Sequence, residues 1–152
     1  FIDLPPGTSD IHLSLVQTVP VTGAVLVTTP QKVALADAQK GMNMFQQPQI
    51  NVPVLGVIEN MAYFTPKELP NNKYYIFGRD GGKKLAEKGE VPFIGEIPLV
   101  QSIREGGDLG YPVIMQEGPA SEAISKVADG VAQRIAIRNA EKAETKKVEL
   151  KV

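Results

Sequence analysis

The sequence predicts an α/β protein in which a doubly wound, mostly parallel sheet carries helices on both faces. Three apolar, β-branched segments indicate the strands, at residues 23–29, 53–60 and 91–97. Each is apolar at nearly every position rather than at alternate ones, which is typical of strands covered on both faces. The spacing of about 25 to 35 residues between them leaves room for a helix in each connection, as in βαβ units.

The composition is that of an ordinary globular domain. The chain has 152 residues, of which 43% are hydrophobic, a formal net charge of −1 and no cysteine, so its length suggests one domain with a real core. The nearly neutral charge argues against a general nucleic-acid binder and against docking on acidic membranes. The sequence contains no run of about 20 apolar residues, which is the length needed to cross a bilayer. Disulfides, thiol nucleophiles and cysteine-ligated clusters within this chain are excluded.

The first elements are expected in the order strand, helix, strand, helix. Phe1-Ile2 is interpreted as the end of a strand, and because the chain opens inside it without Met or a signal peptide, we expect a piece of a longer protein. A short helix follows Asp10. Thr29 and Pro30 predict the start of the second helix, as its N-cap and its first residue. One apolar face of that helix is formed by Leu35, Ala38, Met42 and Phe45.

The second half of the chain predicts two short helices and a long one. Residues 82–88 form a helix that Gly89 stops, residues 100–105 form another, and Ser121 caps the last. Gly130 weakens the last helix by roughly 1 kcal/mol relative to alanine without breaking it. The buried stripe expected on this helix is Ile124, Val127, Ala128, Val131 and Ile135.

A change in charge pattern divides the chain near residue 139. Residues 1–138 are expected to form the folded domain, and residues 139–152, which are rich in Lys and Glu, a charged terminal tail that frays or is solvated. The least regular part of the domain is residues 63–77. A long insertion of this kind in a compact domain is usually functional or mobile.

Polar or chain-directing residues stand at the carboxyl ends of all four expected strands. They are Asp3, Thr28-Thr29-Pro30, Asn60 and Pro98. In an open parallel sheet, ligands bind beyond the carboxyl ends of the strands. The sequence therefore predicts a ligand site at this edge.

The sharpest local signal begins at Asp3. An Asp that ends an apolar strand can hold a water on Mg²⁺, as the Walker B residue of P-loop NTPases does. Pro5 and Pro6 stiffen the turn that follows, and Gly7 allows a backbone N–H to approach a terminal phosphate. The alternative is an ordinary strand-to-helix turn in which Asp10 or the serine before it caps the next helix. No phosphate-binding loop accompanies this motif, because Gly-Lys at 82–83 is followed by Lys rather than Ser or Thr.

Several short motifs occur in a specific order along the chain. They are Asp3 to Gln17, Val25 to Gln31, Gly56 to Phe64, Ile76 to Gly78 with Gly81-Gly82, Gly95 to Leu99, and Ile103 to Glu105. This series closely resembles the Mrp/ApbC family, P-loop ATPases of the MinD/ParA type that are regarded as iron–sulfur cluster carriers. The resemblance covers residues 1 to about 115 and implies that the amino-terminal half, with a deviant Walker A loop, would precede Phe1.

The resemblance implies a catalytic role for the first motif. Asp3 would ligate Mg²⁺ through water, and Pro5, Pro6 and Gly7 would form the switch that senses the γ-phosphate of ATP. Asp10 matches the acid that closes this motif, without a firm role.

The resemblance also implies an adenine site. Asn60 would read the base, since a carboxamide can bond the N6/N7 edge of adenine with both its donor and its acceptor. The alternative is an Asn that closes a strand in a turn. Pro98 and the backbone around Ile97 would line the adenine pocket, although Pro98 considered separately is only a turn residue.

One departure from the family concerns the cluster. Many members carry a C-x-x-C pair just after the Asn-Met-x-Tyr-Phe segment, and two thiolates per subunit would complete a four-cysteine site across a dimer. Residues 65–75 hold no cysteine, and Glu68, Asn71 and Asn72 are poor ligands for iron–sulfur chemistry. The protein would bind a cluster through cysteines outside this chain, serve another client, or carry no cluster.

The function expected from these arguments is part of an ATP-binding, ATP-hydrolysing cluster carrier. It would be a cytoplasmic homodimer that hands a cluster to a client apoprotein or a scaffold protein, with no nucleic-acid or membrane partner. The chain without a Walker A loop is expected to be inactive. The alternatives are a MinD/ParA-type positioning or regulatory ATPase, which the mixed Lys/Glu tail disfavours on membranes, and a non-catalytic scaffold domain.

Overall fold

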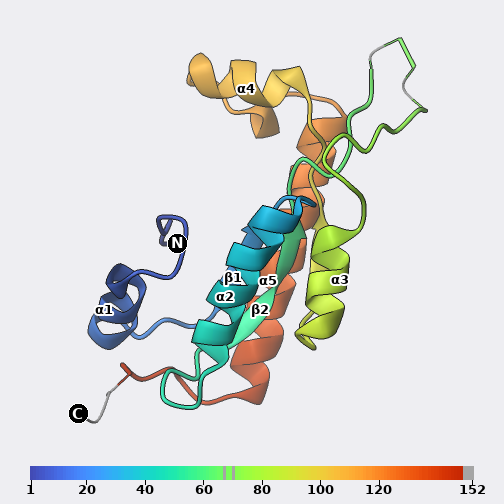
Figure 1. Ribbon diagram of the computed structural model, residues 1–152. Helices are drawn as coiled ribbons and strands as arrows, with labels where there is room; N and C mark the ends of the chain where they lie inside the picture. The colour runs from blue at the N-terminus through green and yellow to red at the C-terminus, as the bar shows by residue number, and fades with distance from the viewer. Residues whose placement is uncertain (67, 70, 149–152) are drawn as a thin grey trace.

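A three-stranded parallel sheet forms the centre of the described structure. The computed structural model describes residues 1–66, 68–69 and 71–148. The strands are β1 (Ala24–Thr28), β2 (Val54–Glu59) and β3 (Phe93–Glu96), in the spatial order β1–β2–β3 (Figure 1). Each falls inside a segment predicted to be a strand, and both strand pairs are parallel, so the predicted sheet is confirmed.

Helices cover both faces of the sheet. On one face α2 (Lys32–Gln46) packs on β1 and α3 (Gly81–Lys88) packs on β2, while α5 (Pro119–Glu141) crosses β2 and β3 on the other face (Figure 1). The α2/α3 side is sealed by Met42, Val57, Leu85 and Ala86. The α5 side is sealed by Ile58, Val127 and Val131. Alternate residues of β2 thus enter different cores, which explains its uninterrupted apolar sequence.

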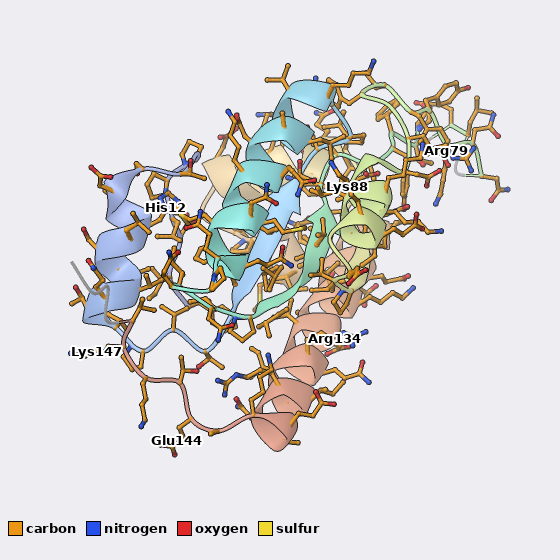
Figure 2. All side chains as sticks on the ribbon, turned by 60° about the horizontal axis from the view of Figure 1, so that its bottom comes forward. His12, Arg79, Lys88, Arg134, Glu144 and Lys147 are labelled. Atoms are coloured by element: carbon orange, nitrogen blue, oxygen red, sulfur yellow. The ribbon has the colours of Figure 1, made fainter. Side chains whose placement is uncertain are left out.

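Three further helices lie outside these layers. They are α1 (Asp10–Thr18), α4 (Gln101–Asp108) and the 3₁₀ turn η1 (Val113–Met115). Helix α1 contributes Val16 to a cluster with Met44, Phe45, Ile50 and Val52, and its Leu13 packs against that cluster. His12, on the α1 side that faces α2 (Figure 2), is buried and lies within 3.4 Å of Ser9 Oγ.

The expected strand at Phe1-Ile2 is wrong for the described structure. Both side chains are exposed and neither residue belongs to the sheet. An apolar pair does not make a strand without a neighbouring strand to accept its hydrogen bonds. The chain instead turns through Leu4, which packs against the Val16 cluster beside α1.

Two predicted helix starts are also wrong. Helix α2 begins at Lys32 rather than Pro30, and Gln31 rather than Thr29 is its N-cap. Helix α5 begins at Pro119 with Gly118 as N-cap, so that Ser121 lies inside its first turn and donates a hydrogen bond to the Ile114 carbonyl. In both cases a Pro or Gly sets the backbone direction before the helix. The hydroxyl that fits the N-cap pattern instead makes another hydrogen bond.

The face of α5 that packs on the sheet is nearly the predicted one. Val127 and Val131 are buried and Ile135 packs beside them, whereas Ala128 is exposed. Gly130 also has a role in packing. A Cβ there would lie 2.8 Å from Ile94 Cγ2, so its hydrogen side chain permits the close approach of α5 to β3.

The carboxyl-terminal segment differs from the expected fraying end. Helix α5 runs three residues past the predicted border, to Glu141. The chain then returns to α1, where the Val148 N–H donates to the Val16 carbonyl at 3.0 Å and the Val148 side chain joins the Val16 cluster. Most other side chains of 142–148 are exposed, and residues 149–152 lie outside the described part. The division of the chain at residue 139 remains a prediction.

Candidate functional site

The carboxyl ends of β1, β2 and β3 meet at one edge, as predicted. The Asn60 N–H donates to the Thr28 carbonyl at 2.7 Å, and the Ile97 N–H donates to the Glu59 carbonyl at 2.8 Å. The Ala62 N–H then donates to the Ile97 carbonyl at 3.0 Å. These backbone bonds continue the sheet past its last strand residues and bring three of the four predicted strand ends together.

Asn60 is half-buried at the middle of this edge. Its side-chain oxygen accepts the N–H of Met61 at 2.9 Å, which stabilises a turn in which Met61 adopts a positive φ of 53°. Both interpretations of Asn60 therefore have a basis, because the oxygen closes the strand while the amide nitrogen keeps its two donors. On the adjoining strand end, Pro98 is buried and Ile97 half-buried. The three residues predicted to line an adenine pocket thus share one edge.

Glu59 is a residue at this edge that sequence reasoning missed. It is 1% exposed, at the end of β2, and its carboxylate accepts the N–H of Gly82 in the first turn of α3. A carboxylate at a helix amino terminus satisfies backbone donors and faces the positive end of the helix dipole. The signal was a charged residue inside an otherwise apolar strand.

The environment of Glu59 opposes its ionisation. Burial raises the pKa of the carboxyl above its ordinary value, and the carboxylates of Glu96 and Asp80 add to the rise, while the N–H groups of Gly82 and Gly81 act in the other direction. The two N–H groups offset part of the cost of burying the carboxylate. Glu59 is therefore tied to α3 and holds that helix against the carboxyl end of β2.

Close glycine contacts complete the connection between α3 and the strand ends. A Cβ on Gly81 would lie 2.9 Å from the Pro30 Cα and carbonyl oxygen, and one on Gly82 would lie 3.0 Å from Glu59 Cβ. The two glycines let α3 begin directly against the turn after β1 and against β2. Helix α3 begins one residue before the predicted start, and the lysines that follow the two glycines are exposed.

The segment between Asn60 and α3 projects beyond this edge (Figure 1). In its described residues, the regular pairing consists of isolated bridges from Phe64 to Tyr74 and Leu99. Lys73 lies over the Tyr63 ring at 3.7 Å, and Arg79 over the Tyr75 ring at 4.7 Å. Residues 67 and 70 of this irregular segment lie outside the described residues.

The Asp3 motif does not lie at this edge in the structure. Figure 1 shows the amino-terminal segment on the α1 side, away from the end where the strands finish. Asp3, Pro5, Pro6 and Gly7 are exposed, and Gly7 has a positive φ of 92°. Asp10 is the first residue of α1. The structure therefore separates the two predicted groups of site residues.

No group of three or more His, Cys, Asp or Glu residues that could hold a metal occurs in the described part of the chain. A single carboxylate such as Asp3 is still compatible with Mg²⁺, which keeps several waters and takes one or two carboxylates together with substrate phosphates. Nor does any described helix combine the length and apolar character needed to span a membrane.

A layered parallel sheet with polar groups at the carboxyl ends of its strands is an architecture of nucleotide-binding α/β domains. The family model described as "ParA: NUBPL iron-transfer P-loop NTPase" matches residues 1–136. The chain belongs to this family.

Curated relatives carry iron–sulfur names. The "Iron-sulfur cluster carrier protein" of Deinococcus radiodurans is 50% identical over 139 residues, which are 90% of this chain and 38% of that protein. The protein of the same name from Synechocystis sp. is 45% identical with the same two coverages. The "Iron-sulfur cluster transfer protein NUBPL" of Mus musculus is 46% identical over 80% of this chain and 37% of its own length. The chain thus spans less than two fifths of these relatives.

Solved structures agree on the fold. A nucleotide-binding protein from Archaeoglobus fulgidus, determined in complex with ADP, is 37% identical with a TM-score of 0.64 and covers 77% of this chain and 46% of its own. The Pyrococcus furiosus cell division ATPase MinD has a TM-score of 0.54 at 23% identity over 74% of this chain and 43% of its own, which supports the fold alone.

Proposed function

We propose that this chain supplies the adenine-side and switch segments of an ATP-hydrolysing carrier of iron–sulfur clusters. The observation that carries the proposal is the edge where Asn60, Ile97 and Pro98 come together, in a chain whose relatives are named as cluster carriers. The ADP complex of the Archaeoglobus relative supports nucleotide binding. The MinD/ParA positioning alternative is supported by fold likeness only.

At the strand ends, Asn60 would orient the nucleotide. Its amide nitrogen can donate to a ring nitrogen of adenine while its oxygen keeps the Met61 N–H. Pro98 and Ile97 offer an apolar wall beside it. Glu59 would hold this wall in register, because it joins β2 to α3 through its side chain and β2 to Ile97 through its backbone.

The Asp3 motif would act on the phosphates. Mg²⁺, when bound, would neutralise charge that develops on the transferred phosphoryl group. Asp3 would hold a water of that ion, and the backbone at Gly7 would donate to the γ-phosphate after the stiff Pro5-Pro6 turn. Because this segment lies beside α1 in the described conformation, it would have to reach the strand ends when ATP binds. Asp10 begins α1 directly after this segment and is given no separate role.

The cluster would be cargo held partly outside this chain. The sequence contains no cysteine, so thiolate ligands would come from elsewhere in the carrier or from its client. A homodimer in the cytoplasm that releases the cluster to an apoprotein or scaffold fits this arrangement, since hydrolysis would change the shape of the dimer. The chain by itself is expected neither to hydrolyse ATP nor to bind it tightly.

The test uses the intact protein, prepared anaerobically with iron and sulfide. We expect slow Mg²⁺-dependent ATP hydrolysis together with an iron–sulfur absorption spectrum. Asn60→Ala should weaken ATP binding by about tenfold, the cost of one good base contact, whereas Asn72→Ala in the exposed loop should not. An iron-free protein that still hydrolyses ATP would remove the cluster from the proposal. Equal ATP affinity of the two variants would remove Asn60 from the adenine site.

A further inference from the structure

A cationic pocket lies at the end of the sheet opposite the proposed nucleotide edge. It has a volume of about 300 Å³ and lies between the residues that lead into β1 and β2 and the segment that returns from α5 to α1. We call it the basal pocket. Its lining residues relevant here are Val16, Ile50, Arg138, Lys142, Lys146 and Lys147.

The charge of the basal pocket is one-sided. Arg138, Lys142, Lys146 and Lys147 line it, and no Asp or Glu is among its described lining residues. Lys147 lies beside α1, whereas Glu144 lies at the outer bend of the same segment (Figure 2). The carboxyl end of α5 contributes a partial negative charge of about half a unit, which the four cations exceed. The pocket therefore has an excess of positive charge.

Arg138 is the most buried of these cations. It is 9% exposed, and its Nε has no hydrogen-bond partner among the described residues. Its two terminal nitrogens donate to neutral oxygens, Asn139 Oδ1 at 3.1 Å and Thr145 Oγ1 at 2.5 Å. No ion pair of Arg138 with a carboxylate occurs in the described part of the chain. A buried guanidinium is rarely stable without a counter-charge.

We propose that the basal pocket binds a phosphate-bearing anion that supplies this counter-charge. A guanidinium fork flanked by ammonium groups matches the geometry and charge of a phosphate. The volume is about ten times the space one water takes in the liquid, so the pocket has room for a phosphate on a small organic body as well as for the free ion. Such a ligand is distinct from the nucleotide, because the basal pocket is formed at the amino-terminal ends of the strands.

Binding would also fasten the returning segment. Residues 142–148 are held by the Val148 N–H bond to the Val16 carbonyl and by the Arg138–Thr145 bond. An anion shared by Arg138, Lys146 and Lys147 would add a bridge between α5 and this segment. The signature of binding is therefore local, namely slower amide hydrogen exchange over residues 142–148.

The first experiment measures binding of inorganic phosphate to the intact protein at constant ionic strength, with chloride as reference. We expect phosphate, but not chloride, to raise the thermal midpoint and to slow exchange in 142–148. The double variant Lys146→Gln/Lys147→Gln should weaken phosphate binding by about tenfold or more. The matched control Lys40→Gln/Lys126→Gln removes the same charge from exposed positions and should bind as the wild type does.

A second variant tests Arg138 directly. Arg138→Met removes the buried charge and should abolish the protection of 142–148 by phosphate. The affinities for glycerol 3-phosphate and for free phosphate are then compared, to establish whether the site prefers an organic phosphate or the inorganic ion. Tighter binding of either ligand supports the site. Equal loss in both lysine double variants would overturn the proposal, because it would indicate a general charge effect. So would phosphate that protects only the strand carboxyl ends, or that acts no differently from chloride.

Discussion

Glu59 and Arg138 are both buried charged residues, but their surroundings differ. Glu59 ends β2 and receives backbone N–H groups from the start of α3. Arg138, near the end of α5, has only neutral side-chain acceptors and an unpartnered Nε within the described structure. Both are nearly inaccessible to solvent. The fold thus gives one carboxylate backbone N–H donors at the carboxyl end of the sheet, and gives the guanidinium at the opposite end only neutral side-chain acceptors.

This difference indicates that Glu59 has a structural role, whereas Arg138 fits the proposed anion site. A carboxylate that receives hydrogen bonds from a helix terminus joins two elements, and its removal leaves their donors unpaired. A guanidinium without a counter-charge lowers stability until an anion arrives. Substitutions at the two ends should therefore have different consequences.

The largest expected effect is at Glu59. Glu59→Ala would leave the N–H groups of Gly81 and Gly82 without an acceptor and create a cavity beneath α3, so we expect a loss of about 2–4 kcal/mol in the free energy of unfolding. Urea denaturation measures it. Glu87→Ala, an exposed change on the same helix, should stay within about 0.5 kcal/mol. A Glu59 variant as stable as this control would mean that α3 does not depend on the carboxylate.

The next effect tests the contact of α3 with the turn after β1. Gly81→Ala places a Cβ 2.9 Å from Pro30 backbone atoms, and a shift of the helix start should cost about 1–3 kcal/mol. The control is Gly107→Ala in α4, where a Cβ would meet nothing within 4 Å. That change should be neutral or stabilising by up to about 1 kcal/mol, since alanine favours the helix. Equal stabilities of the two variants would contradict tight packing at Gly81.

The local sequence pattern predicted the sheet because each strand is a continuous run of apolar residues. Val57 and Ile58 enter opposite cores, and apolar side chains at consecutive positions are typical of a short strand covered on both faces. The starts of α2 and α5 were harder to predict. Thr29 and Ser121 have hydroxyls that suit an N-cap, but the backbone direction set by Pro30 and Gly118 determines where each helix begins.

The candidate site was predictable only in part. Asn60 and Pro98 could be placed at one edge, because parallel strands end together. Glu59 could not be assigned, since its partner, the start of α3, is 23 residues further along the chain. The basal pocket depends on a segment that looks like a solvated tail, and its contact with Val16 joins residues from opposite ends of the chain.

A smaller effect is expected at the basal pocket. Thr145→Val keeps the shape of the side chain but removes the oxygen that accepts from Arg138 Nη2, which should cost about 1 kcal/mol. The matched control is Thr18→Val, whose hydroxyl donates to the Ser14 carbonyl at an exposed position. Phosphate should restore part of the stability of the first variant and none of the second. Urea midpoints with and without phosphate test both statements, and a lack of difference would show that Arg138 does not need this acceptor.

The smallest expected effect is the contribution of Glu59 to the pH dependence of the unfolding free energy. Because burial raises the pKa of this carboxyl in the folded protein above its ordinary value of 4.5, the folded state binds its proton more tightly than the unfolded state does. Its contribution to stability is therefore fully present below pH 4.5 and is lost as the pH rises through the higher folded pKa. Glu59→Gln cannot titrate, so its unfolding free energy should fall less than that of the wild type over this window. Glu87→Gln should keep the wild-type slope, and an unchanged slope in Glu59→Gln would show that the N–H groups of Gly81 and Gly82 offset the burial completely.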